Sequence, residues 1–300
     1  MLPIVHHPEY LAPLRPGHRF PMSKYGYVRA ALVSRGLLTP GGYLAPAKAT
    51  RGQIELAHQP NYVDRVFSGT LSAEEIRRIG LPQTDQVVTR SRLSSSGTLL
   101  AAWMALEHGI ACNSAGGSHH AGPDYGAGFC VLNDVAVAVA NLFAQGFSGP
   151  VLIVDADVHQ GDGTARIFQD HPGVFTLSIH AERNFPARKA ASSLDVALPD
   201  GTEDADYLAA LSAALDQSFA AADPRLVFYN AGVDVFTDDK LGRLSLSLDG
   251  IRAREAMVLT AARSRDVPIV GVLGGGYSDD PVALADRHAI LFEEAARLVG

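Results

Sequence analysis

The sequence predicts an α/β fold in which a single parallel β-sheet is flanked by helices on both faces. Short, continuous apolar segments, typical of strands buried on both faces, alternate with longer segments typical of helices. The 300 residues, 47% of them hydrophobic, are enough for one large core. No Pro/Ser-rich linker, charge run or internal repeat divides the chain. We therefore expect residues 1–300 to form a single domain.

Regular elements are expected mainly after the first ninety residues. That first part is rich in Pro, Gly, His and Tyr and predicts only short helices, at 25–35 and 72–79. A helix at 93–108 is then ended by Gly109, because glycine is typical just after a helix. The other expected helices are 133–145, 164–170, 204–221, 249–264 and 281–299, and the expected strands are 110–114, 151–155, 174–179, 225–230 and 268–273.

Four polar clusters each follow one of the expected strands. In open α/β sheets, ligands bind beyond the carboxyl ends of the strands, so we expect these clusters to converge on one site. The clusters are Ser118-His119-His120, residues 155–162, Gly232-Val233-Asp234 and Gly274-Gly275-Gly276-Tyr277.

Residues 155–162 suggest a metal site. Asp157 and His159 are two positions apart, so in extended chain they point the same way. A carboxylate oxygen with an imidazole nitrogen suits a divalent metal such as zinc, and three protein ligands would leave an open position for chemistry. The alternative is that both residues only end a strand and cap the next helix.

The overall charge and the cysteine count exclude several classes of protein. A net charge of −7 argues against direct nucleic-acid binding, although a mildly acidic surface is compatible with basic peptide substrates. Cys112 and Cys130 are too few for a disulfide framework. The N-terminus has no basic leader, and no segment is apolar for long enough to span a membrane. We expect a cytoplasmic protein with no membrane partner.

Five motifs carry a resemblance to a known family. From about residue 91 to the end, the chain is similar to the zinc-dependent histone deacetylases of the arginase/deacetylase superfamily. Segments 201–204 and 239–247 resemble the class IV branch more than class I. The five motifs are Gly116-Gly117-Ser118-His119-His120-Ala121, residues 128–134, residues 155–163, Asn230-Ala231-Gly232-Val233-Asp234 and residues 274–277.

The resemblance implies a zinc ion, or iron(II) in its place, held by Asp157, His159 and Asp234. Taken alone, Asp234 would more often be a turn residue. The family also implies a histidine pair beside the metal water, with His120 as general base and acid and His119 mainly electrostatic. Without the family context, such a pair is more often an ordinary core or surface pair.

Further roles follow from the same resemblance. Asp155 and Asp162 would be the partners of His119 and His120, and Tyr277 would donate to the substrate carbonyl. Tyr277 could otherwise be ordinary core packing. The walls of a lysine channel would be Gly128, Phe129, Phe185, Leu241 and Gly275. A structural potassium ion would use Asp155, Asp157, His159, Ser178 and Ile179, and a second monovalent site would use Phe168, His171 and Val174.

The expected function is that of a zinc-dependent amidohydrolase (deacylase). Its substrate would be a peptide or protein with an acetyl or longer acyl group on a lysine ε-amine. Ser118 stands where the family usually has an aromatic residue, which leaves the acyl length open. A deacetylase of small amines such as acetylpolyamines is an alternative, and it predicts an acidic residue at a constricted mouth. An arginase-like ureohydrolase would need a second metal, and a catalytically inactive binding homologue is also considered.

Overall fold

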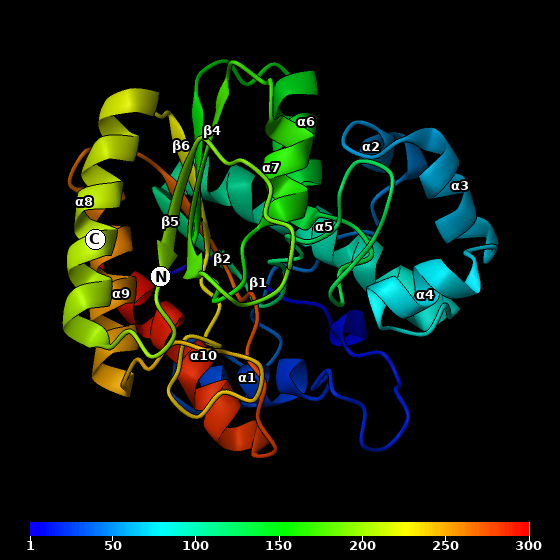
Figure 1. Cartoon of the computed structure of the whole chain (residues 1–300), viewed down its shortest axis with the longest axis horizontal. Helices are drawn as coiled ribbons and strands as arrows, with labels where there is room; N and C mark the ends of the chain where they lie inside the picture. The colour runs from blue at the N-terminus through cyan, green and yellow to red at the C-terminus, as the bar shows by residue number, and fades with distance from the viewer. Residues whose placement is uncertain (300) are drawn as a thin grey trace.

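One seven-stranded parallel sheet runs through the computed structural model, which describes residues 1–299 (Figure 1). All neighbouring strands are parallel, which confirms the expected fold class. In spatial order the strands are β1 (Ile4–Val5), β2 (Ile110–Asn113), β7 (Ile269–Val272), β6 (Leu226–Asn230), β3 (Val151–Asp155), β4 (Val174–Ala181) and β5 (Leu194–Leu198).

The register of the central strands aligns their carboxyl ends. Asp155, the last residue of β3, lies opposite Asn230 of β6 on one side and Ser178 of β4 on the other. The loops that follow β3 and β6 therefore begin side by side. This register brings two distant segments of the chain to the same edge of the sheet.

Helices cover both faces of the sheet. Leu152 and Val154 of β3 face a core shared with α8 (Asp204–Ala222), α9 (Leu248–Arg263), α10 (Pro281–Arg297) and α1 (Lys24–Ser34). The alternate residues, Val151 and Ile153, face α5 (Asp85–His108), α6 (Asp134–Ala144) and α7 (Asp162–Phe168). Figure 1 shows α8 and α9 to the left of the strands and α6 to their right. Because both faces are covered, the strands are apolar throughout rather than alternating.

The two helices expected in the first ninety residues are confirmed as α1 and α4 (Ala73–Ile79), but this part contains more regular structure than expected. Besides α1 and α4, this part forms a 3₁₀ turn η1 (Pro8–Tyr10) and helices α2 (Arg51–Glu55) and α3 (Pro60–Ser68). Capping boxes start α2, at Thr50 and Gln53, and α4, at Ser72 and Glu75. Such local signals define helix starts even where the composition is typical of loops.

Other differences from the expected elements are small. Helix α5 begins at Asp85 rather than 93, because the side chain of Thr84 accepts the N–H of Val87 and caps it. Inside the helix, the hydroxyls of Ser91 and Ser95 donate to carbonyls one turn earlier, so neither hydroxyl is left without a partner. Helix α7 begins two residues before its expected start. Strand β5 was not expected, since it is an edge strand in which partly buried residues alternate with exposed ones.

None of the described helices combines the length and the apolarity that crossing a bilayer requires. Cys112 and Cys130 are both buried free thiols.

Candidate active site

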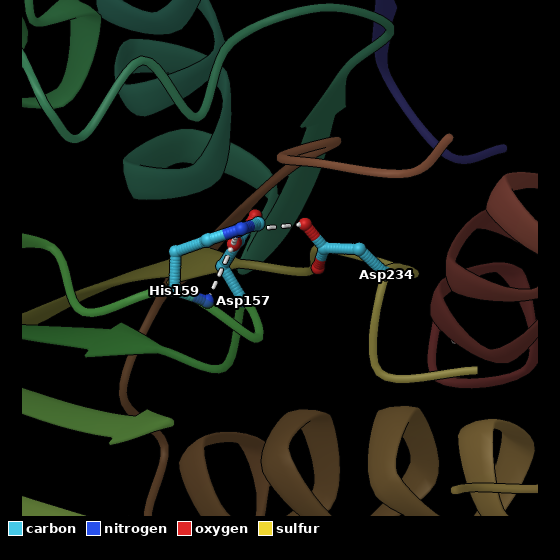
Figure 2. A group of neighbouring side chains, drawn as sticks. All are labelled: Asp157, His159 and Asp234. Carbon is cyan, nitrogen blue, oxygen red and sulfur yellow. Dashed lines mark hydrogen bonds and ion pairs between the residues drawn. The ribbon is translucent and has the colours of Figure 1, made fainter. Parts of the chain in front are cut away.

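Asp157, His159 and Asp234 come together at the carboxyl edge of the sheet. Asp157 and His159 lie in the loop after β3, and Asp234 lies in the loop after β6. Figure 2 shows the three side chains pointing toward one another. His159 Nδ1 lies 3.0 Å from Asp157 Oδ1 and 3.1 Å from Asp234 Oδ2. One potential ligand atom from each residue falls within 4.8 Å of the others.

The donor set of this cluster fits a divalent cation. All three side chains are buried, and two buried carboxylates require a compensating positive charge. Backbone N–H groups fix the carboxylates: Gly275 donates to Asp157 Oδ2 at 2.6 Å, and Val158 donates to Asp234 Oδ1 at 3.0 Å. Two carboxylate oxygens and one imidazole nitrogen are ligands that suit zinc or iron(II).

The two adjacent histidines are each paired with a carboxylate. His119 Nδ1 lies 2.6 Å from Asp155 Oδ2, and His120 Nδ1 lies 2.7 Å from Asp162 Oδ1. Since a carboxylate only accepts, each Nδ1–H donates, and Nε2 is left as the second functional atom of each ring. His119 Nε2 is 3.7 Å from Asp157 Oδ1, so His119 directly borders the cluster of Asp157, His159 and Asp234.

The two rings differ in charge environment. Burial, and then the charge of His119, lower the pKa of His120 to about 4. Burial opposes protonation of His119 too, but the charges of Asp155 and Asp157 outweigh it and raise the pKa of His119 to about 9. The pair thus presents one ring that favours the cationic form and one that favours the neutral form.

Tyr277 borders the same cluster from the glycine loop after β7. Its ring lies edge-on to His159, with centroids 6.3 Å apart, and Asp239 Oδ2 accepts its backbone N–H at 2.7 Å. Burial, and then the charge of Asp234, raise the pKa of the Tyr277 hydroxyl well above its usual value of 10. The hydroxyl therefore stays protonated and can act as a hydrogen-bond donor.

A hollow of about 510 Å³ leads from the surface to His120, His159 and Tyr277. Four of the five expected channel residues line it, namely Gly128, Phe129, Phe185 and Leu241. Gly275 lies elsewhere and borders a deeper cavity of about 30 Å³, together with Ser118 and Asp157. No side chain would fit at position 275, because a Cβ there would overlap the carboxylate of Asp234 and lie 2.7 Å from Asp157 Oδ2.

The mouth of this hollow is basic, which the acidic overall charge did not suggest. None of the described residues that line it is Asp or Glu, and six are arginines. Arg243 pairs with Asp200 at 3.0 Å, and Arg78 donates to the carbonyl of Gly126 at 3.0 Å. The six arginines are Arg15, Arg19, Arg77, Arg78, Arg183 and Arg243.

Several residues that shape the site were not identified from the sequence. The N-terminal segment supplies Arg15 and Arg19 to the mouth, and the carbonyls of Arg78 and Ile79 accept the backbone N–H groups of Gly128 and Phe129 at 3.1 and 2.6 Å. Phe129 has a φ of 66°, an uncommon conformation for a residue with a side chain. The capping box of α4, at Ser72 and Glu75, was a sequence signal for local order close to Arg78 and Ile79.

Asp134 supports the loop that carries the two histidines. It accepts the N–H of Ser118 at 2.7 Å, the N–H of Gly117 at 3.2 Å and the hydroxyl of Thr98 at 2.6 Å. Asp134 is the last residue of the 128–134 motif, so the sequence contained a signal for it.

Arg254 joins the loop after β3, which carries Asp157 and His159, to the loop after β6, which carries Asp234. Its Nη1 donates to the carbonyl of Gly232 at 2.6 Å and to that of Ala156 at 3.0 Å, and its Nη2 pairs with Glu255 at 2.6 Å. The side chain is fully buried. Nothing in the sequence distinguished this arginine, which lies inside a helix.

The residues expected to bind monovalent cations also lie close together in two sets. Asp155 and Ser178 are register partners in neighbouring strands. Asp157 and His159 come two and four residues after Asp155, and Ile179 comes directly after Ser178. In the second set, a turn joins the residues: His171 donates its N–H to Phe168, and Val174 donates to His171, at 3.0 and 3.1 Å. Bound potassium at either place stays a prediction.

Comparisons with known proteins agree with this geometry. The family model "Histone deacetylase domain" matches residues 18–291. The chain is 45% identical over 293 residues to an uncharacterised protein of Picosynechococcus sp., and the match covers 98% of each chain. It is 33% identical to histone deacetylase 2 of Arabidopsis thaliana, over 87% of this chain and 70% of that protein.

A more distant relative is the acetoin utilization protein AcuC of Staphylococcus aureus, 27% identical over 87% of this chain and 73% of that protein. The crystal structure of the HDA15 HD domain superposes with a TM-score of 0.80 at 22% identity, covering 99% of this chain and 92% of that one. That structural likeness supports the fold, and the family model supports the membership. The chain therefore belongs to the histone deacetylase family.

Proposed function

We propose that residues 1–300 form a single catalytic domain, a zinc-dependent amidohydrolase that removes acetyl groups from lysine ε-amines. Family membership gives the broader statement, that of a deacetylase-type hydrolase. One observation carries the proposal: the Asp157, His159 and Asp234 cluster, two histidine–carboxylate pairs and Tyr277 meet at the inner end of one hollow.

Asp157, His159 and Asp234 would hold the cation, zinc or iron(II). Such a cation acts as a Lewis acid toward a carbonyl and lowers the pKa of a water toward about 7. The remaining groups of the site belong to the protein, and their geometry supports distinct roles.

His120 is suited to move the proton. Asp162 holds its Nδ1–H at 2.7 Å, which fixes the tautomer and leaves Nε2 to accept a proton from water and return it to the leaving lysine amine. His119, bonded to Asp155, acts mainly through its positive charge. The protonated hydroxyl of Tyr277 would donate to the oxygen on which negative charge develops.

The inner cavity favours a short acyl group. At about 30 Å³ it has room for a group of the size of one water molecule or a methyl. A longer chain would have to displace buried Phe20 or Tyr25, which also border it. The cavity beside Ser118 is therefore small, although the family usually has an aromatic residue at this position, and acetyl is the proposed acyl group.

The mouth disfavours the alternative of acetylpolyamine substrates. Those cations would be recognised by acidic residues, whereas the described mouth contains six arginines and neither Asp nor Glu. A catalytically inactive homologue would lack some of the expected metal-binding and catalytic residues, whereas this chain has all of them.

Turnover of lysine peptides that carry acetyl through myristoyl groups tests this proposal. We expect the acetyl peptide to be hydrolysed fastest, with activity lost in Asp157→Asn together with bound metal. Tyr277→Phe should lower kcat by about 10²–10³ with metal retained, whereas Tyr27→Phe, on the exposed face of α1, should not. Full activity after complete metal removal, or equal rates for Tyr277→Phe and wild type, would contradict the mechanism.

A further inference from the structure

The basic mouth is a local feature of an acidic chain. The chain carries a net charge of −7, with 25 Lys and Arg against 32 Asp and Glu. Nevertheless, six arginines and no acidic residue were found among the described residues that line the hollow. Like charges gathered at one place repel one another, so the arrangement favours a ligand that brings negative charge.

Four of these arginines are free to bind such a ligand. Arg15, Arg19, Arg77 and Arg183 are exposed, and within residues 1–299 none of them pairs with a carboxylate. Arg78 and Arg243 are engaged instead: Arg78 stacks at 4.8 Å on the ring of Tyr125, and Arg243 pairs with Asp200.

The arginines come from separate segments around the opening. One pair lies in the loop after η1 and another pair lies near the end of α4. Of the two remaining arginines, Arg183 follows β4 and Arg243 lies in the loop between β6 and α9. A single small anion would be held by arginines converging on one point. Arginines spread around an opening instead fit several separated negative charges, as on an extended peptide that crosses the mouth.

The charge of the reacting group changes during hydrolysis in a way that fits this mouth. An acylated lysine is neutral, so the arginines do not repel it when it enters the hollow. The product lysine is a cation, and the same arginines then favour its departure. Negative charges beside that lysine would hold the peptide while the neutral side chain inserts.

We propose that the substrate is an acyl-lysine flanked by Asp and Glu residues, bound by Arg15, Arg19, Arg77 and Arg183. This inference deepens the proposed function and rests on it. It replaces the expectation that the acidic surface suits basic peptides, because the mouth and not the whole surface meets the substrate.

Three acetyl-lysine peptides of equal length, with acidic, neutral or basic flanks, test the proposal. At low salt we expect kcat/KM to be about 10-fold higher for the acidic than for the neutral peptide, chiefly through KM. The preference should fall to about 2-fold in 0.5 M salt, where the Debye length is about 4 Å. Equal kcat/KM for the three peptides would overturn the proposal.

Charge reversal assigns the effect to these arginines. The double variant Arg77→Glu/Arg183→Glu should lose the acidic preference and gain activity on the basic peptide, a gain that a misfolded protein would not show. Arg225→Glu is the matched control, because Arg225 is exposed and precedes β6 at the opposite edge of the sheet. An unchanged preference in the double variant would overturn the proposal.

Peptide binding separates failure of this inference from failure of the proposed function. Fluorescence anisotropy with labelled peptides reports binding even where nothing is hydrolysed. Tighter binding of the acidic peptide without turnover would retain the assignment of the mouth and reject the catalytic proposal. Tight binding of a DNA duplex at physiological salt, with no preference among the three peptides, would show that the mouth binds another kind of polyanion. That result would overturn the inference.

Discussion

His58 should make the stability of this protein depend on pH below 6.5. The ring is buried and lies between two backbone groups: Nδ1–H donates to the carbonyl of Gly122 at 2.8 Å, and Nε2 accepts the N–H of Asn133 at 3.0 Å. Only the neutral ring can donate at one nitrogen and accept at the other. Burial lowers the pKa of His58 from 6.5 to about 4.

The sign and size of the effect follow from this shift. Between pH 6.5 and about 4 the unfolded chain binds a proton that the folded chain does not, so the free energy of unfolding falls as the pH falls. The full loss is about 3 kcal/mol, and about 2 kcal/mol of it is reached by about pH 5. Above pH 6.5 both states are neutral and the effect disappears.

Urea unfolding of wild type and His58→Gln, followed by the fluorescence of Trp103, tests this. Glutamine also has a donor and an acceptor but does not titrate, so the stability of the variant relative to wild type should rise by about 2 kcal/mol from about pH 7.5 to about pH 5. His108→Gln, at an exposed histidine at the end of α5, is the matched control. A difference between wild type and His58→Gln that does not change with pH would refute the reasoning.

Three more predictions concern the candidate active site. Gly275→Ala should weaken metal binding by about 10–100-fold, measured by competition with a chelator, because the new Cβ would displace the Asp157 and Asp234 carboxylates. The control Gly52→Ala, where a Cβ has open space, should leave metal binding unchanged. Asp162→Asn should lower kcat by about 10²–10⁴ with unchanged metal content, and a wild-type kcat would reject its role in orienting His120. Removing a metal present at about 100 times its Kd should lower Tm by about 5 °C, reversibly on adding zinc, and an unchanged Tm would argue against the cluster as a metal site.

The sheet was predictable because its strands are continuous apolar segments. β3 was expected at 151–155 and lies there, since both of its faces are covered and no alternation obscures it. β5 was missed because an edge strand with exposed positions resembles a loop. Helices α2 and α3 were missed because they are short, at 5 and 9 residues, and Pro60 follows the segment that separates them, although the capping box at Thr50 and Gln53 marks the start of α2.

The inner part of the site was predictable for a different reason. Its residues are polar side chains in places where a sheet would otherwise be apolar, and Asp157 and Asp234 each follow a buried strand. The mouth was not predictable in this way. Arg77 and Arg183 are ordinary surface residues in the sequence, and only the folded chain places them around one opening. Their common position depends on long-range packing, which no local pattern encodes.

The position of Arg254 has a consequence for synthesis of the protein. Its guanidinium binds the carbonyls of Ala156 and Gly232, although it lies in α9, well after both loops in the chain. A nascent chain that has emerged only as far as Asp234 already contains Asp157, His159 and Asp234 but lacks the Arg254 guanidinium that joins their loops. We expect high-affinity zinc capture to begin only when α9 has left the ribosome, so a fragment ending near residue 240 should bind zinc weakly.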